Sequence, residues 1–565
     1  MKPHRFKLLT AATVLACLCS FVVLFAVSVQ VPATGKDAVV APSEASSPEV
    51  APAPSAAGSA SNAASDAASD AESDPAPAPD DDPIAYAPGY VLASIADGVS
   101  DGQAAETLAA TPGLAGATIE GHVDGSIVKV ALPAGLAVES AVDLLGQSAA
   151  FESAQPNYRY YVQETAGPDP DAATAALVRT AEDATASLVA GTDLGNALST
   201  QSSAPNDPYY VRQWSLGSVN APEAWDLVAA NAKASSAVTV AVIDNGFMVN
   251  HEDLKSHIVD FYNAKADSTA MGTDNSDHGS HVAGIVSAVT NNKKGVASVA
   301  NNALGLMVIR VSDSKGEITT DTILNAYTYI MKHASTHNVR VVNMSLGAPS
   351  SKPVSRSTDP ALYDAIGKAR NAGIVTVAAA CNEEGNYEPP FYAYPGDFNN
   401  VVSVISLEQA DERWNADGVV RDPTSNYNTL MQFSYARAKN ISAPGAGIYS
   451  AYSNNYSYAW ESGTSMSSPL VAGVIGLMFT VNPDLTAAQA ESLLYSSAKD
   501  LVEWPAGTGW DYETGYGEVD AAAAVAAAGA TASSTKGNIA SCQVTAADAA
   551  YTGSAVSTAV KVVDG

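Results

Sequence analysis

Three short strings of this sequence hold residues whose side chains could together carry out acyl transfer. Ser465 stands in Gly-Thr-Ser-Met-Ser-Ser-Pro, His278 opens His-Gly-Ser-His-Val-Ala-Gly, and Asp244 closes the apolar run Val-Ala-Val-Ile-Asp. A serine hydroxyl becomes a nucleophile when a neighbouring imidazole takes its proton, and a carboxylate can hold that imidazole in the correct tautomer. The three strings therefore predict a serine-dependent hydrolase, provided that the fold brings them together.

Each of the three residues also has an ordinary structural interpretation. An aspartate at the end of a strand is commonly a turn residue, and a serine in a Ser-rich turn is commonly a helix cap. Two features favour catalysis. Glycines beside His278 allow close approach of the backbone. Ser465 is expected just before an apolar helix whose first turn holds Pro469, where the helix dipole favours the negative charge that develops during acyl transfer.

The elements that must position these residues alternate in type between residues 206 and 528. Apolar runs rich in Val and Ile alternate with helical patterns, which predicts an α/β fold with three layers: a mostly parallel central sheet with helices on both faces. Ligands of such sheets bind beyond the carboxyl ends of the strands. We expect strands at 237–243, 306–311, 339–344, 373–379 and 400–406, and helices at 320–337, 360–372, 468–480 and 486–498.

In the order Asp, His, Ser, the three strings resemble the subtilisin-like serine peptidase family, and in particular its thermitase-like branch. The resemblance covers residues 206–528 and includes the start Asn-Asp-Pro-Tyr-Tyr and the end Gly-Tyr-Gly-Glu-Val-Asp. It implies an endopeptidase in which Asp244 orients His278, His278 serves as the base for Ser465, and Asn382 donates to the oxyanion. His281 is expected to be structural.

The resemblance also implies where protein or peptide substrates bind. An extended substrate would add as a strand along Ser345, Leu346 and Gly347, through backbone hydrogen bonds that are indifferent to side chains. The specificity pocket would be walled by this same segment and by Ala379, Ala380 and Cys381. It would lie near Tyr394-Pro395-Gly396, where a cis proline is implied. Cys381 stands where the family usually has glycine, and Ala348 replaces a second glycine. We therefore expect a mid-sized apolar or aromatic residue before the cut.

Members of the family bind structural Ca²⁺ through hard oxygen ligands. Asp207 and Asp253 match two ligands of the thermitase-like site, and the loop from Asn291 to Val296 matches the binding loop. This loop carries two lysines, Lys293 and Lys294, whose charges oppose a cation. The expected calcium ligands are Asp207, Asp253, Asn291 and Val296.

The first part of the chain predicts export and self-inhibition. Residues 1–33 form a basic start and an uncharged apolar run, expected to be a signal peptide cleaved after Ala33, with an uncleaved membrane anchor as the alternative. Residues 34–86 are an Ala, Pro, Ser and acidic spacer. Residues 87–163 alternate strand and helix patterns and resemble the family's inhibitory propeptide, a small α+β domain that would act as an intramolecular inhibitor. Residues 164–205 form a linker, and autocleavage is expected within residues 163–205.

Composition limits the remaining alternatives. The chain has 28 basic and 59 acidic residues and a formal charge of -31, which disfavours nucleic acid as a partner. We expect a secreted or cell-surface monomer. Residues 529–565 look like a linker and a partial β module, and the segment 408–432 has no explanation. Two competing functions are a catalytically silent surface adhesin on a peptidase scaffold and an esterase that uses the same triad.

Overall fold

The structure is a computed structural model that describes twelve stretches of the chain. The signal segment, residues 34–85 of the spacer, residues 164–203 of the linker and the segment 408–432 lie outside the described residues. Of the two compact units into which the chain divides, Met1–Ala76 and Pro77–Gly565, only the second contains described residues. The stretches are 86–162, 204–231, 237–270, 276–350, 352–382, 392–407, 440–453, 457–501, 509–511, 514–534, 542–545 and 561–564.

Residues 86–162 form a two-layer α+β domain. Strands β1 and β4 pair antiparallel, as do β1 and β3 and then β3 and β2. Alternate residues of β1 face opposite ways: Val91 and Ala93 pack with the two helices, whereas Leu92 joins the core of the following domain. The elements are β1 (Tyr86–Ile95), α2 (Asp101–Ala110), β2 (Thr118–Asp124), β3 (Ile127–Ala131), α3 (Val138–Gly146) and β4 (Phe151–Val162).

The larger domain is built on a parallel sheet of seven strands in the order β14-β13-β11-β9-β5-β7-β6. Every pairing within it is parallel, and most of its strand residues are buried, as their near-continuous apolar sequences require. Its strands are β5 (Val238–Asp244), β6 (Ile258–Asn263), β7 (Leu304–Arg310), β9 (Val339–Met344), β11 (Val375–Ala379), β13 (Val402–Leu407) and β14 (Ile441–Pro444).

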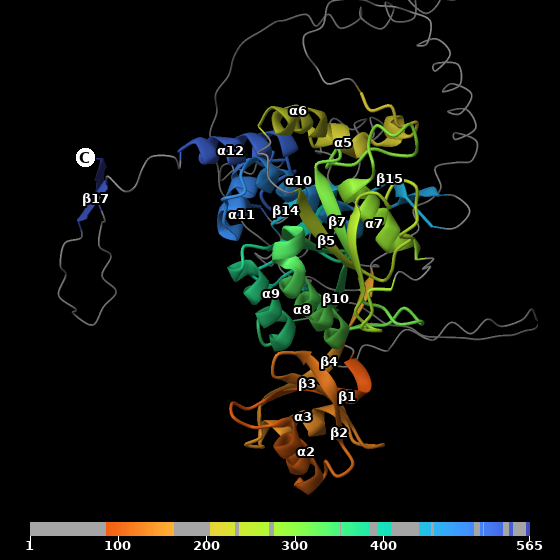
Figure 1. Cartoon of the computed structure of the whole chain (residues 1–565), viewed down its shortest axis with the longest axis vertical. Helices are drawn as coiled ribbons and strands as arrows, with labels where there is room; N and C mark the ends of the chain where they lie inside the picture. The colour runs from red at the N-terminus through yellow and green to blue at the C-terminus, as the bar shows by residue number, and fades with distance from the viewer. Residues whose placement is uncertain are drawn as a thin grey trace, which may run out of the picture. The chain divides into compact units, whose positions relative to one another are not determined.

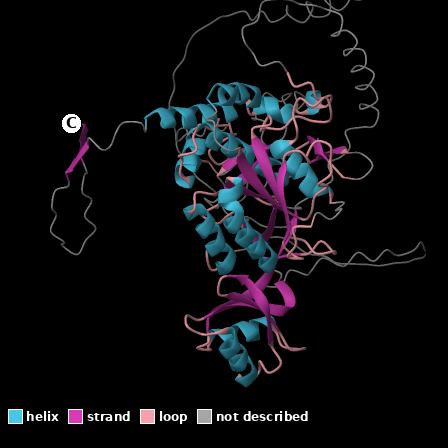
Figure 2. Ribbon diagram, in the orientation of Figure 1, coloured by secondary structure: helices cyan, strands magenta, loops and turns pink. Residues whose placement is uncertain are grey.

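Helices cover both faces of this sheet (Figures 1 and 2). Side chains of β5 alternate between two cores: Val240 and Val242 pack with α7 and α10, whereas Ala241 and Ile243 pack with α8 and α9. The three-layer α/β prediction is confirmed. The helices are α5 (Trp214–Ser218), α6 (Ala221–Asn231), α7 (Asp277–Ser287), α8 (Thr320–His337), α9 (Pro360–Asn371), α10 (Thr464–Val481), α11 (Ala487–Ser496) and α12 (Ala521–Ser534), with a 3-10 turn η1 at Tyr210–Arg212.

Helix α10 is the one helix among the described residues that is long and apolar enough to cross a membrane, yet 94% of it is buried inside the protein. It is therefore the central core helix of the larger domain. The remaining strands are short: β8 (Ile318–Thr319), β10 (Leu346–Ser350), β12 (Tyr392–Tyr394), β15 (Ile448–Ala451), β16 (Tyr458–Glu461), β17 (Cys542–Thr545) and β18 (Lys561–Asp564).

Candidate active site

Asp244 and His278 form a buried pair at the carboxyl end of the central sheet. Asp244 is the last residue of β5, and its Oδ1 lies 2.8 Å from Nδ1 of His278, the second residue of α7. Both side chains are fully buried. The backbone N–H of Asn245 also donates to Oδ1 of Asp244, at 2.7 Å. These contacts fix the carboxylate, which accepts the Nδ1 proton and so makes Nε2 the basic nitrogen of a neutral imidazole.

Gly279 lets the first turn of α7 approach the loop after β5. A β-carbon at Gly279 would lie 2.1 Å from the carbonyl oxygen of Gly246 and 3.1 Å from Cβ of Asp244. No side chain fits there, so the glycine next to His278 sets the distance between imidazole and carboxylate. This confirms the expectation that a glycine beside His278 allows the backbone to approach closely.

Ser465 is the second residue of α10, whose N-cap is Gly463. Its Oγ lies 3.2 Å from the carbonyl oxygen of Ser345. The carbonyl of Ser465 would normally accept from the residue four positions later. That residue is Pro469, which has no N–H, and the Oγ of Ser345 donates to this carbonyl instead, at 2.8 Å. The sequence had placed Pro469 in the first turn. It lies in the second, and Ser345 supplies the hydrogen bond that its ring removes.

Asn382 follows β11 and contacts the residue before Ser465. Its Oδ1 accepts the backbone N–H of Thr464 at 3.0 Å and the Thr464 hydroxyl at 2.8 Å. With Oδ1 held in this way, the amide has a fixed orientation, and its Nδ2 points away from Thr464. The structure thus brings Asn382 to the N-terminus of α10, beside Ser465.

His281 lies one turn after His278 and is buried. Its Nε2 faces the carbonyl oxygens of Ile448 and Ala459 at 3.0 and 3.2 Å, and burial lowers its pKa to about 3. A neutral ring that donates to backbone carbonyls ties α7 to β15 and β16. This environment suits the structural role expected for His281.

The residues expected to wall the specificity pocket come from two adjoining segments. Ala379 ends β11, and the N–H of Ala380 donates to the carbonyl of Val404 at 3.0 Å. Cys381 is buried with a left-handed φ of +71°, a conformation that favours glycine. The Tyr394-Pro395 bond is cis, as expected. Nearby, a β-carbon at Gly396 would lie 2.7 Å from the carbonyl oxygen of Ala379.

A strand of the small domain lies along the segment at residues 345–347 that is expected to bind substrate. Strand β4 pairs antiparallel with β10, matching Val162 to Leu346 and Tyr161 to Gly347. On its other side, β4 pairs with β8. The end of the small domain therefore lies as a middle strand between two strands of the larger domain, which is the geometry of an extended peptide added to a sheet edge.

Strand β4 also caps two helices of the larger domain. Asn157 donates from Nδ2 to Asp321 and accepts the Asp321 backbone N–H, both at 3.0 Å, at the start of α8. Gln155 accepts the backbone N–H of Ala361 at 2.9 Å and donates to Asp359, the N-cap of α9, at 2.8 Å. These contacts satisfy donors that helix termini otherwise leave without partners.

Two buried carboxylates gather around the loop expected to bind calcium. Asp207 accepts the backbone N–H groups of Asn291 and Asn292 at 2.7 and 3.0 Å. Asp253 accepts the backbone N–H of Val296 at 3.0 Å and the Nδ2 of Asn292 at 2.6 Å. Burial raises the pKa of both carboxyl groups. Buried carboxylates gathered at one loop offer the hard oxygen ligands that suit Ca²⁺.

Three details of this loop were not foreseen. Asn292 contacts Asp253, whereas the Oδ1 of Asn291 accepts the N–H of Asn206. Lys294 turns to Glu252, 2.8 Å away. Finally, a β-carbon at Gly295 would lie 2.0 Å from Oδ2 of Asp253. The Asn-Asn-Lys-Lys-Gly-Val string marked both asparagines as part of the expected calcium loop. Only the tertiary contacts show that Asn292, and not Asn291, is the one that contacts Asp253.

Comparisons with known proteins agree with this architecture. A family model described as the subtilase family matches residues 235–517. Thermitase from Thermoactinomyces vulgaris is 35% identical over 275 residues, covering 48% of this chain and 85% of thermitase. Subtilisin DY from Bacillus licheniformis is 33% identical over 298 residues, covering 53% of this chain and 95% of that protein.

One solved structure with a similar fold is fervidolysin from Fervidobacterium pennivorans, described as a keratinolytic enzyme related to subtilisin. The two structures match with a TM-score of 0.57 at 21% sequence identity, over 78% of this chain and 61% of fervidolysin. At that identity the likeness supports the fold alone.

Proposed function

Because this chain belongs to the subtilase family, in its thermitase-like branch, and is a serine endopeptidase, we propose that it cuts proteins with Asp244, His278 and Ser465 as its triad. The observation that carries the assignment is the buried 2.8 Å contact between Asp244 and His278. It lies at the carboxyl end of the sheet, where α7 packs against α10, the helix whose second residue is Ser465. Ligands of parallel α/β sheets bind at this end.

In the proposed reaction His278 takes the hydroxyl proton of Ser465 through Nε2 while Oγ attacks the scissile carbonyl. Asp244 keeps Nδ1 protonated and stabilises the imidazolium that forms. The proton then passes to the leaving amine, and a water molecule releases the acyl group from Ser465 by the same route.

The developing oxyanion is assigned to two donors, the backbone N–H of Ser465 and the side-chain amide of Asn382. Ser465 stands in the first turn of α10, where the helix dipole stabilises negative charge. Thr464 orients the amide of Asn382 through its two hydrogen bonds to Oδ1. Donors held in this way need no reorganisation when the charge appears.

We further propose that residues 87–163 keep the enzyme inhibited until they are removed. Support comes from β4, which fills the position between β10 and β8 that an extended substrate would take. Along β4, Tyr161 lies opposite Gly347 and Val162 opposite Leu346, and the carbonyl of Ser345, the residue before Leu346, lies 3.2 Å from Oγ of Ser465. We therefore expect the first autocleavage directly after Gln163, at the amino end of the predicted linker.

Secretion and structural calcium belong to the same proposal. The apolar amino-terminal run supports export, and the buried Asp207 and Asp253 support a Ca²⁺ ion held by the loop that contains Asn292 and Val296. When bound, the ion would supply positive charge to two carboxylates that burial has deprived of water.

The decisive experiment labels the secreted, matured chain with a fluorophosphonate and measures casein hydrolysis. We expect labelling at Ser465 and a loss of activity of at least about 10³-fold in Ser465→Ala, because the nucleophile is gone. Ser462→Ala is the matched control and should keep both properties, because Ser462 lies three residues away and its hydroxyl accepts the N–H of Gly447. An adhesin on a peptidase scaffold would show neither labelling nor casein hydrolysis in the parent protein.

A further inference from the structure

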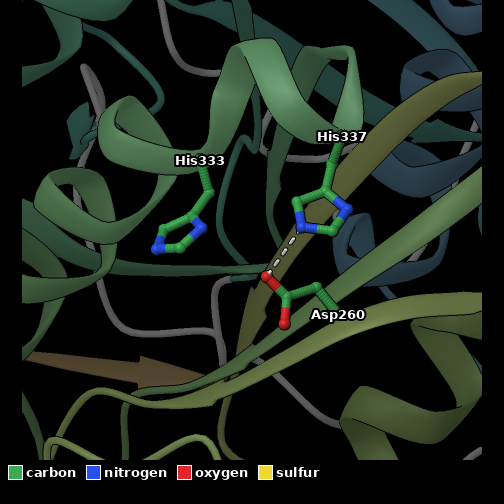
Figure 3. A group of neighbouring side chains, drawn as sticks. All are labelled: Asp260, His333 and His337. Atoms are coloured by element: carbon green, nitrogen blue, oxygen red, sulfur yellow. Dashed lines mark ion pairs between the residues drawn. The ribbon is translucent and has the colours of Figure 1, made fainter.

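Away from the active site, Asp260, His333 and His337 bring their side chains together. His333 and His337 lie one turn apart on α8, and Asp260 belongs to the edge strand β6 (Figure 3). One nitrogen or oxygen atom from each residue lies within 4.8 Å of those from the other two. Nε2 of His337 is 3.4 Å from Oδ2 of Asp260.

This cluster lies away from the triad: Asp260 is level with Ala241 in the middle of β5, and His337 lies near the start of that strand. The carbonyl of His337 accepts a hydrogen bond from Thr239, near the start of β5, whereas Asp244 ends the same strand. Five residues of extended chain separate Thr239 from Asp244, which is about 16 Å. The cluster is therefore independent of the catalytic residues.

Its composition and spacing match those of a transition-metal site. Two histidines four residues apart on a helix present their imidazoles on one face, as in helical zinc-binding motifs. Ligand atoms about 2.0 to 2.1 Å from a tetrahedral zinc ion lie about 3.3 Å from one another. The 3.4 Å between His337 and Asp260 is already that separation. The ligand atom of His333 lies within 4.8 Å of those of the other two residues, so it would have to move closer to both when the ion binds.

Neighbouring groups hold the carboxylate and one imidazole in place. Oδ1 of Asp260 accepts the backbone N–H of Phe261 at 2.9 Å, and Oδ2 accepts the Tyr329 hydroxyl at 2.9 Å. The ring of His333 stacks on Tyr329, with centroids 4.2 Å apart, and Tyr329 stacks in turn on Tyr262. Such outer contacts are typical of metal ligands that must keep a fixed orientation.

We propose that Asp260, His333 and His337 bind a Zn²⁺ ion or a similar divalent transition metal, with water as the fourth ligand. Two imidazole nitrogens and one carboxylate favour such ions over Ca²⁺ and Mg²⁺, which take oxygen ligands. The side chains of His337 and Asp260 are 24% and 18% exposed, so the ion can enter from solvent. The metal would fasten the last turn of α8 to β6 and stabilise the edge of the sheet.

The test uses the full chain carrying Ser465→Ala, which prevents autolysis and makes the result independent of proteolysis. Zn²⁺ affinity and stoichiometry are measured by competition with a chromophoric chelator, and Co²⁺ is followed by its visible absorption. His333→Ala and His337→Ala remove ligands. Asp260→Asn removes the charge but keeps an acceptor for Tyr329. His122→Ala is the matched control, because His122 also faces a carboxylate, that of Asp101 at 3.0 Å.

We expect each of the three variants to lose one bound Zn²⁺ or to bind it at least ten-fold more weakly, with a smaller Co²⁺ signal. The His122→Ala chain should behave like its parent. Zn²⁺ should also raise the midpoint of thermal unfolding in the parent and in His122→Ala, but not in His333→Ala or His337→Ala. Unchanged affinity and stoichiometry in both of those histidine variants would overturn the proposal and leave His337 and Asp260 as a simple ion pair.

Discussion

The sulfur of Cys381 lies against Gly347: a β-carbon built at Gly347 would be 2.5 Å from Sγ of Cys381. The two residues come from the two walls expected for the specificity pocket, and Cys381 occupies a conformation that favours glycine. The sulfur thus fills space that a glycine at position 381 would leave open. We therefore expect the identity of residue 381 to affect which side chains the pocket accepts.

Gly347→Ala should therefore lower kcat/KM by about 5- to 150-fold, because overpacking of a close contact costs about 1 to 3 kcal/mol. Cys381→Gly should by itself shift the preferred residue before the cut toward larger aromatic side chains. In the double variant the space left by the sulfur should restore most of the lost activity. A peptide series with that one residue varied measures all three effects. If the change in kcat/KM of the double variant equals the combined changes of the two single variants, the two residues do not share this space.

Asn157→Ala should weaken self-inhibition by about ten-fold, since it removes both hydrogen bonds to the first turn of α8 and a helix cap contributes about 1 to 2 kcal/mol. The inhibition constant of the processed amino-terminal fragment measures this effect. Ser153→Ala is the matched control, because Ser153 is an exposed residue of the same strand. Equal inhibition by the Asn157→Ala and Ser153→Ala fragments would contradict the capping role.

Acid should release the amino-terminal domain, and Lys129 should govern part of that response. Burial acts to raise the pKa of Asp321, but the Lys129 ammonium, 2.8 Å away, and hydrogen bonds outweigh it and hold the pKa below its ordinary value of 3.8. The contact therefore favours the ionised carboxylate. Its contribution is complete above pH 3.8 and is lost as the pH falls through the lowered pKa.

Lys129→Met should accordingly weaken retention of the cleaved domain by about 30-fold near pH 7, because it leaves a buried carboxylate without its cation, a loss of about 2 kcal/mol. Below pH 3.8 the difference between variant and parent should shrink. Size-exclusion chromatography of the processed Ser465→Ala complex, formed from separate fragments, measures retention across this range. If the difference in retention between Lys129→Met and the parent did not change with pH, Asp321 could not be the titrating partner of Lys129.

Ca²⁺ should raise the midpoint of thermal unfolding, with a gain of about 2.7 kcal/mol at a hundred-fold excess over Kd. Asp253→Asn should abolish the shift, whereas Asp313→Asn, in an exposed turn away from the loop, should leave it unchanged. Since burial raises the pKa of Asp207 and Asp253, protons compete with the ion, and the shift should fall as the pH drops toward their raised pKa values. A chelator that leaves the midpoint unmoved would exclude structural calcium.

The sequence alone was enough to predict the layers of the larger domain, and it named the residues that we propose as the triad. Period-two and helical patterns are local, so the apolar run that ends at Asp244 and the helix that starts near Ser465 could be located without coordinates. The α+β character of residues 87–163 followed from the same patterns. The position of Pro469 was misjudged by one turn, because the start of a helix depends on its cap and not on periodicity.

Tertiary structure decided the contacts between segments that are distant in the sequence. Asn157 meets Asp321 across 164 residues, and Asp260 meets His337 on another element. No local pattern marks such pairs, because each residue alone is ordinary for its strand or helix. Their chemistry arises only when sheet register and helix packing fix the separations to within a few tenths of an ångström. For the same reason Asn292 contacts Asp253 where Asn291, its identical neighbour, does not.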